Sequence, residues 1–222
     1  MIYRILSPEE FNDLSARILY EDNHLLIVNK KVGEIVQGDK TSDEPLTETY
    51  KAFIAQRDDK PGQVFMGLPH RLDRPVSGIV VLAKTSKALE RLNAMFRDSE
   101  VRKYYWALVC AAPQPQEGHL EDMMWRNEKQ NKSYICRPGS ARKDAKLAKL
   151  NYKQIDRTER YHLVEVELLT GRHHQIRCQL SNLGCPIKGD LKYGAPRSNP
   201  DGGISLHARR ITFVQPVKKE HM

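Results

Sequence analysis

Apolar and polar residues alternate along much of the chain with the period of two that is typical of half-buried β-strands. Val164, Val166 and Leu168, for example, alternate with Leu163 and glutamates in a strand predicted over residues 161–169. Turn-forming residues separate such stretches from one another. The pattern predicts further strands over residues 17–20, 25–30, 78–84, 101–110, 119–125, 132–137, 147–155 and 210–214.

Fewer stretches have the period of 3.6 that predicts a helix. Ser7 and Glu10 form a capping box at the start of one helix. Apolar residues within 46–54 fall on one helical face, and Ser86 is expected to cap another helix. A last helix is predicted over 171–183, where a glycine and a proline follow.

Many strands and few helices predict an α+β fold, with a mixed, mainly antiparallel β-sheet and flanking helices. The 222 residues suffice for one large domain or two small lobes. The only soft boundary in the sequence is a Pro/Gln/Gly-containing stretch at 112–118. We therefore expect a single domain over residues 1–222.

The chain has a formal net charge of +8 and a pI of about 9.3. This excess favours polyanionic partners, although a solvated basic surface without a partner has the same composition. The longest apolar run, 79–83, is too short to span a bilayer, and residues 1–6 do not form a secretory signal. We expect a cytoplasmic protein without a membrane partner.

Four cysteines occur without Cys-x-x-Cys or zinc-finger spacing. In a cytoplasmic chain such residues are usually packed thiols rather than disulfides. The sequence therefore predicts no structural metal site.

Candidate chemistry is concentrated in residues 70–78, His-Arg-Leu-Asp-Arg-Pro-Val-Ser-Gly. Arg71 and Arg74 flank Asp73, and cations at this distance should keep a carboxylate ionised. Gly78 allows a close backbone approach or an unusual dihedral angle. A turn with a structural ion pair explains the same residues equally well.

Two later segments also carry polar or aromatic clusters. Residues 169–177 place many donors at a strand end and helix start, which favours anions, although His173 and His174 could be surface residues. Residues 102–107, Arg-Lys-Tyr-Tyr-Trp-Ala, combine rings and cations as RNA contact requires. Core packing is the alternative for each ring there.

Residues 70–73 with Ser77 and Gly78 resemble the signature of the RluA-type RNA pseudouridine synthase family. Further segments resemble the same family in the same order, and the resemblance covers about residues 17–216. Val76 stands where the family usually has Thr, and Lys31 where many relatives have Pro. The further segments are residues 18–30, 102–107, 170–177, 184–190 and 206–208.

The resemblance implies a central RNA-binding cleft and an isomerase that converts uridines in structured RNA, rRNA or tRNA, to pseudouridine. It implies base flipping and no cofactor. Asp73 would be the catalytic carboxylate, Tyr104 would stack on the flipped base, and Arg177 would hold Asp73. Arg71 would fill the gap left by the uridine, and Leu206 would form an apolar wall.

The remaining candidate RNA-binding residues are His70, Arg74, Arg172 and His174. About sixteen residues precede the match, so no N-terminal accessory RNA-binding domain is expected, and a monomer is the default. The reaction involves no net redox change and no phosphoryl transfer, which agrees with the lack of nucleotide-binding or metal motifs in the sequence. The carboxylate could act as a nucleophile or as a base, and the sequence leaves both open.

Two other functions fit parts of the sequence. The first is a non-catalytic RNA-binding protein, such as an rRNA chaperone with the same fold. The second is a metal-dependent hydrolase that uses His70, His173, His174 and Asp73, although these residues lack a known ligand motif.

Overall fold

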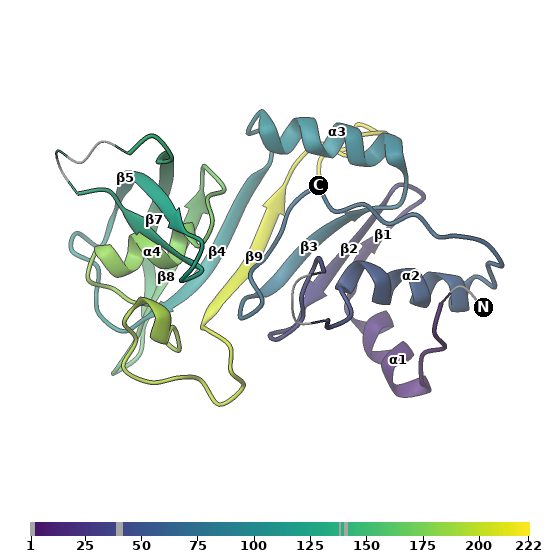
Figure 1. Cartoon of the computed structure of the whole chain (residues 1–222), viewed down its shortest axis with the longest axis horizontal. Coiled ribbons are helices and arrows are strands. Elements are labelled where there is room, and N and C mark those ends of the chain that lie inside the picture. The colour runs from purple at the N-terminus through teal and green to yellow at the C-terminus, as the bar shows by residue number, and fades with distance from the viewer. Residues whose placement is uncertain (1–2, 39–41, 138, 140–141) are drawn as a thin grey trace. The chain divides into compact units, whose positions relative to one another are not determined.

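The computed structural model describes residues 3–38, 42–137, 139 and 142–222 (Figure 1). The chain forms two compact units, the first made of Met1–Val101 and Thr212–Met222 and the second of Arg102–Ile211. The boundary suggested by residues 112–118 instead lies inside the second unit, between two of its strands.

The first unit contains an antiparallel sheet in the order β1-β2-β3. Its strands are β1 (Ile18–Glu21), β2 (Leu25–Lys30) and β3 (Ser77–Ala83). Its helices are α1 (Pro8–Ala16), α2 (Leu46–Arg57) and α3 (Ser86–Arg97). Both β2 and β3 are buried along most of their length, which explains why they are nearly continuous apolar runs.

Side-chain hydrogen bonds cap the first turns of α1 and α3. The capping box of Ser7 and Glu10 is present at α1, which confirms that prediction. At α3 the cap is Thr85, whose side chain accepts a hydrogen bond from the Ala88 amide, so the assignment of Ser86 was wrong by one residue.

The second unit contains strands in the order β9-β4-β8-β7-β5-β6. The adjacent pairs from β4 to β6 are antiparallel. One helix, α4 (Gln175–Asn182), and a short 3-10 helix, η1 (Leu191–Tyr193), complete the unit. The strands are β4 (Arg102–Val109), β5 (Glu117–Asn127), β6 (Lys132–Ile135), β7 (Lys146–Arg157), β8 (His162–Leu168) and β9 (Leu206–Thr212).

The expected α+β architecture is confirmed, and two of its boundaries shift by four residues. Helix α4 begins at Gln175 rather than near residue 171, because His174 has the left-handed conformation with φ 52°. Strand β9 begins at Leu206, four residues before the predicted start. Among the described residues, no helix combines the length and apolar character that crossing a membrane requires.

Helix α4 covers one face of the second unit's sheet, the α4 face. Cys178 of α4 packs against Ala148 of β7. Tyr152 lies two alternations further along β7, so it points to the same face. Tyr152 is opposite Val166, and Val166 is opposite Tyr105. Side chains opposite one another in an antiparallel pair share a face, so Tyr105 belongs to the α4 face.

A buried ion pair joins α4 to the turn before η1. The Arg177 Nε donates to Asp190 Oδ2 at 2.6 Å, and Nη2 donates to Oδ1 at 2.9 Å. The two side chains are only 6% and 1% exposed. The Arg177 guanidinium also lies 5.1 Å from the centroid of the Tyr193 ring. This two-point contact fixes the plane of the guanidinium.

We expect Asp190→Asn to lower the free energy of unfolding by about 3–5 kcal/mol, because it leaves the Arg177 charge buried without its carboxylate. Urea unfolding followed by circular dichroism measures the change. Glu117→Gln is the control, since Glu117 pairs with Lys153 on the exposed surface, and it should leave the midpoint unchanged. An Asp190→Asn midpoint equal to that of the control would contradict a structural role for the buried pair.

Candidate active site

Asp73 lies in a turn that leads directly into β3. The Val76 amide donates to the Asp73 carbonyl at 3.0 Å, which closes the turn. Leu72 and Val76 are buried, whereas the Asp73 side chain is only half-buried. Gly78, at the start of β3, has φ 115°, the unusual dihedral angle that the sequence suggested. The apolar neighbours therefore anchor the turn that carries the carboxylate.

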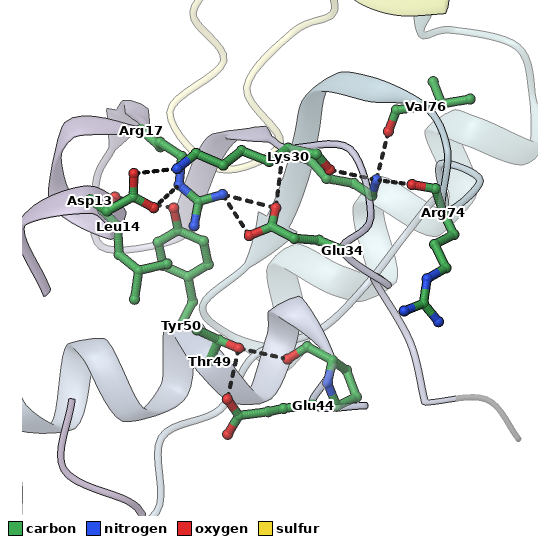
Figure 2. A network of polar contacts seen from close by, with 12 residues as sticks. Asp13, Leu14, Arg17, Lys30, Glu34, Glu44, Thr49, Tyr50, Arg74 and Val76 are labelled. Carbon is green, nitrogen blue, oxygen red and sulfur yellow. Dashed lines mark hydrogen bonds and ion pairs between the residues drawn. The ribbon is translucent and has the colours of Figure 1, made fainter. Parts of the chain in front are cut away.

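A buried ammonium group supports this turn from beneath. Lys30, the last residue of β2, is 1% exposed. Its Nζ donates to the carbonyls of Val76 at 2.6 Å, Arg74 at 3.1 Å and Lys31 at 3.0 Å (Figure 2). Three donors meet three carbonyl oxygens, and two of these belong to the Asp73 turn.

Burial lowers the pKa of Lys30 to about 8, while the nearby charges of Glu34 and Asp73 act in the opposite direction. The attraction between Lys30 and Asp73 shows that the cation also belongs to the electrostatic environment of the carboxylate. Lys30 was not among the site residues expected from the sequence. A lysine that ends an otherwise apolar, buried strand was the available signal, because lysine is seldom fully buried without partners.

The segment that follows Lys30 is itself held in place. Arg17 Nη1 donates to both carboxylate oxygens of Glu34, at 2.7 and 2.8 Å, and the Glu34 carboxylate accepts from the Lys31 amide (Figure 2). The Gly33 amide donates to the Arg74 carbonyl at 3.0 Å. The 30–34 segment therefore binds the Asp73 turn through both a side chain and the backbone.

The basic neighbours of Asp73 have different environments. His70 Nε2 accepts from the Val81 amide at 2.9 Å, and its ring stacks on Phe96 with centroids 4.8 Å apart. Arg74 forms an exposed ion pair with Asp43 at 2.6 Å. Arg71 is exposed. His70 thus contributes to the packing of the first unit, and Arg71 and Arg74 point toward solvent.

In the second unit, Gln175 organises the loop before α4. Its Oε1 accepts from the Thr170 hydroxyl at 2.8 Å and from the Arg172 amide at 3.0 Å. Its Nε2 donates to the Lys149 carbonyl at 3.0 Å. Arg172 Nε in turn donates to the Leu147 carbonyl at 2.8 Å. These contacts explain why polar residues cluster in this segment: they fix the entry to α4.

His174 occupies the first position before α4 and is 8% exposed. Its Nδ1 lies 3.0 Å from the Tyr193 hydroxyl. Burial, helped by the charge of Arg177, lowers the pKa of His174 to about 2, so the ring is neutral at physiological pH. A buried, neutral ring of this kind suits a positioning role for α4 better than the RNA contact suggested by the sequence.

Tyr104 and Tyr105 lie on opposite faces of the second unit's sheet. Tyr104 is opposite Glu167 on the face away from α4, and its hydroxyl donates to the Glu167 carboxylate at 3.0 Å. Burial and this carboxylate raise the pKa of Tyr104. Tyr105 is 7% exposed and shares the α4 face with Arg177. The structure therefore brings Tyr105, and not Tyr104, to the face of the proposed counter-charge.

The expected site residues divide between the two units. Asp73, His70, Arg71 and Arg74 belong to the first unit, together with Lys30. Leu206, 4% exposed, begins β9 next to β4. Within the described ranges, no group of three or more His, Cys, Asp or Glu is arranged to hold a metal ion. The second unit contains Tyr104, Tyr105, Arg172, His174, Arg177 and Leu206.

The amino-acid sequence of the chain matches those of known proteins. The family model for RNA pseudouridylate synthase matches residues 24–182. The chain is 33% identical over 216 residues to ribosomal large subunit pseudouridine synthase C of Vibrio parahaemolyticus, covering 95% of this chain and 65% of that protein. It is 31% identical over 219 residues to ribosomal large subunit pseudouridine synthase D of Zymomonas mobilis, covering 94% of this chain and 68% of that protein.

The fold agrees with these sequence matches. The structure of human RNA pseudouridylate synthase domain containing 4 superposes with a TM-score of 0.77 at 26% identity, covering 91% of this chain and 86% of that chain. The chain spans about two thirds of the length of the curated relatives that it matches. The model match includes both the Asp73 turn and α4. The chain therefore belongs to the RNA pseudouridylate synthase family, as its RluA-type signature indicated.

Proposed function

We propose that the chain is an RNA pseudouridine synthase that uses Asp73 and no cofactor. The observation that carries the proposal is the Asp73 turn. A half-buried carboxylate is presented by a turn whose backbone is bound by a buried cation, in a chain of the RNA pseudouridylate synthase family. A carboxylate held in this way is ready to react without rearrangement of its support.

The reaction breaks the bond between C1′ and N1, turns the uracil, and joins C1′ to C5. The C5 proton is released and N1 takes up a proton, so no redox partner is needed. Asp73 would attack C1′ or remove the C2′ proton. Arg177 would keep Asp73 ionised, and the ion pair with Asp190 fixes the orientation of its guanidinium. A base inside a stem cannot be reached, so the uridine must be turned out at a cost of a few kcal/mol.

Two side chains would recover part of that cost. Arg71 is exposed, and it would occupy the space that the uridine leaves. We transfer the stacking role that the sequence analysis gave to Tyr104 to Tyr105, because Tyr105 lies on the α4 face with Arg177. Leu206 keeps its proposed role as an apolar wall, and Arg74 and Arg172 would contact phosphates.

The substrate class follows from the relatives' names and from the charge. Two relatives are named for the large ribosomal subunit, and a net charge of +8 favours RNA. We propose structured ribosomal RNA as the substrate to test first, with transfer RNA as the alternative. The RNA-binding cleft, a monomeric state and a cytoplasmic location belong to the same proposal.

Asp73→Asn should reduce tritium release from RNA labelled at uridine C5 by at least about a thousandfold, because the amide can neither attack nor accept a proton. Asp58→Asn is the control, since Asp58 pairs with Arg57, the last residue of α2, and lies outside residues 70–78. Full release by Asp73→Asn would refute the catalytic assignment. RNA binding by the wild-type protein without release from ribosomal or transfer RNA would favour the non-catalytic alternative.

The two tyrosines can be separated by substitution. We expect Tyr105→Ala to lower kcat/KM by about tenfold to a hundredfold, because a stacked aromatic ring contributes about 1–3 kcal/mol per base. Tyr104→Phe removes only the hydroxyl that donates to Glu167 and should leave kcat/KM within about twofold. Steady-state tritium release measures both variants. The opposite ranking would return the stacking role to Tyr104.

Lys30→Met should lower kcat by about tenfold with little change in KM, because the Asp73 turn loses its donors while RNA-contacting groups remain. Wild-type kcat should also fall above about pH 8, where the Lys30 ammonium loses a proton. The pKa of Lys30 is lower in the folded protein than in the unfolded chain. The unfolded chain therefore binds more protons than the folded protein between about pH 8 and pH 10.5. This group therefore makes folding more favourable as pH rises through that window, so activity and stability should diverge.

The pH profile of the variant distinguishes positioning from simple destabilisation. Lys30→Met has no titrating amine, so the alkaline fall that begins near pH 8 should be absent from its kcat profile. A variant that is merely less stable would keep the wild-type profile at lower amplitude. That second result would contradict the positioning role.

A further inference from the structure

Positive charge is concentrated in one hairpin region of the second unit. Residues 125–149, from the end of β5 to the start of β7, contain eight Lys and Arg but only two Asp and Glu. Their net charge is +6 in a chain of +8. The net charge of the whole chain does not reveal this concentration. A local excess of positive charge attracts a polyanion.

Two aromatic rings and a guanidinium form a layered stack within this region. Trp125 of β5 is opposite Tyr134 of β6, and their rings stack with centroids 5.2 Å apart and planes inclined by 25°. The Arg142 guanidinium carbon lies 3.7 Å from the centroid of the Trp125 ring. We call these three side chains the Arg–Trp–Tyr platform.

An ion pair with the neighbouring Asp144 fixes the orientation of the Arg142 guanidinium. Arg142 Nε and Nη2 donate to Asp144 at 3.0 and 3.1 Å. Both of these bonds lie at the edge of the guanidinium, so they do not occupy its faces. One face rests on Trp125, and the Arg142 side chain is 41% exposed. A base can therefore stack on the outer face of a guanidinium whose position is already fixed.

The platform is separate from the groups assigned to catalysis in the same unit. Met124 packs with Cys178 on the α4 face, and its neighbour Trp125 points to the other face. Met123 and Leu147 are opposite one another on that other face and are 44% and 37% exposed. The platform thus belongs to an exposed surface on the face away from Tyr105 and Arg177.

We propose that the Arg–Trp–Tyr platform binds an unpaired nucleotide of the substrate RNA, outside the uridine that is modified. The inference rests on the proposed function for the identity of the partner. Bases in a duplex present only their edges, so a stacking surface selects single-stranded or looped nucleotides. Lys132, whose ammonium lies 5.4 Å from the centroid of the Tyr134 ring, would bind the backbone without regard to sequence.

The first test measures RNA affinity by fluorescence anisotropy with a labelled 12-nucleotide single strand and with a duplex of the same length. Arg142→Ala and Trp125→Ala should each weaken single-strand binding by about tenfold, the usual range for one stacked base. Binding of the duplex should change by less than about threefold. Arg97→Ala is the matched control, because Arg97 is also an exposed arginine paired with a neighbouring aspartate.

Arg142→Lys separates stacking from charge. It keeps the positive charge, so the dependence of affinity on salt concentration should match that of the wild-type protein. It lacks a planar group, so single-strand affinity should fall nearly as far as in Arg142→Ala. Affinity equal to wild type in Arg142→Lys would show that charge alone acts here, and would overturn the stacking proposal.

Kinetics on full-length RNA complete the test. Trp125→Ala should raise KM about tenfold and leave kcat within about twofold, since binding outside the reacting centre is lost equally from the ground and transition states. If wild-type protein releases tritium and the platform variants match it in KM and affinity, the platform proposal fails alone, and another partner such as an acidic protein must explain the surface. If no RNA releases tritium yet the variants lose single-strand binding, the proposed function fails and the platform stands.

Discussion

The buried ammonium of Lys30 is the interaction on which the candidate active site depends. A lysine at the end of a buried strand would be strongly unfavourable if its charge had no partners. Here three backbone carbonyls surround it, and two of them belong to the turn that carries Asp73. Because loss of the lysine would take one donor away from each of these carbonyls, removal of either side is costly. The geometry of the turn and the ionisation of Lys30 therefore depend on one another.

Arg177 has an analogous arrangement in the second unit. Its guanidinium is oriented by two bonds to Asp190 and lies near the ring of Tyr193. Tyr193 in turn contacts His174, the residue whose left-handed conformation starts α4. The arginine that we propose as the counter-charge of Asp73 is thus held by groups that need not touch substrate. In both units, a charge proposed for catalysis is positioned by a buried polar contact rather than by the surface loops alone.

Much of this fold could be predicted from the sequence, because alternation and capping residues are local signals. The strands and the Ser7 cap are examples. The catalytic role that the signature implies for Asp73 stays a prediction. The role of Lys30 could not be predicted, since it depends on two segments that meet only in the fold. Tyr104 and Tyr105 show the same limit. Alternation along β4 places the two rings on different faces of the sheet. Only the pairing of β4, β8 and β7 through Val166 shows which of these faces is covered by α4.

The two faces of the second unit's sheet have different chemical characters. The α4 face carries neutral, buried or firmly paired groups, such as His174, Cys178 and Arg177. At β5 and β6, the other face carries exposed apolar and cationic side chains. Low dielectric on the first face strengthens the few charges that remain there, whereas a cation of the second face such as Arg142 stays partly exposed to water. Because neighbouring side chains along a strand point to opposite faces, one sheet keeps the groups that we propose for catalysis apart from the groups that we propose for RNA binding.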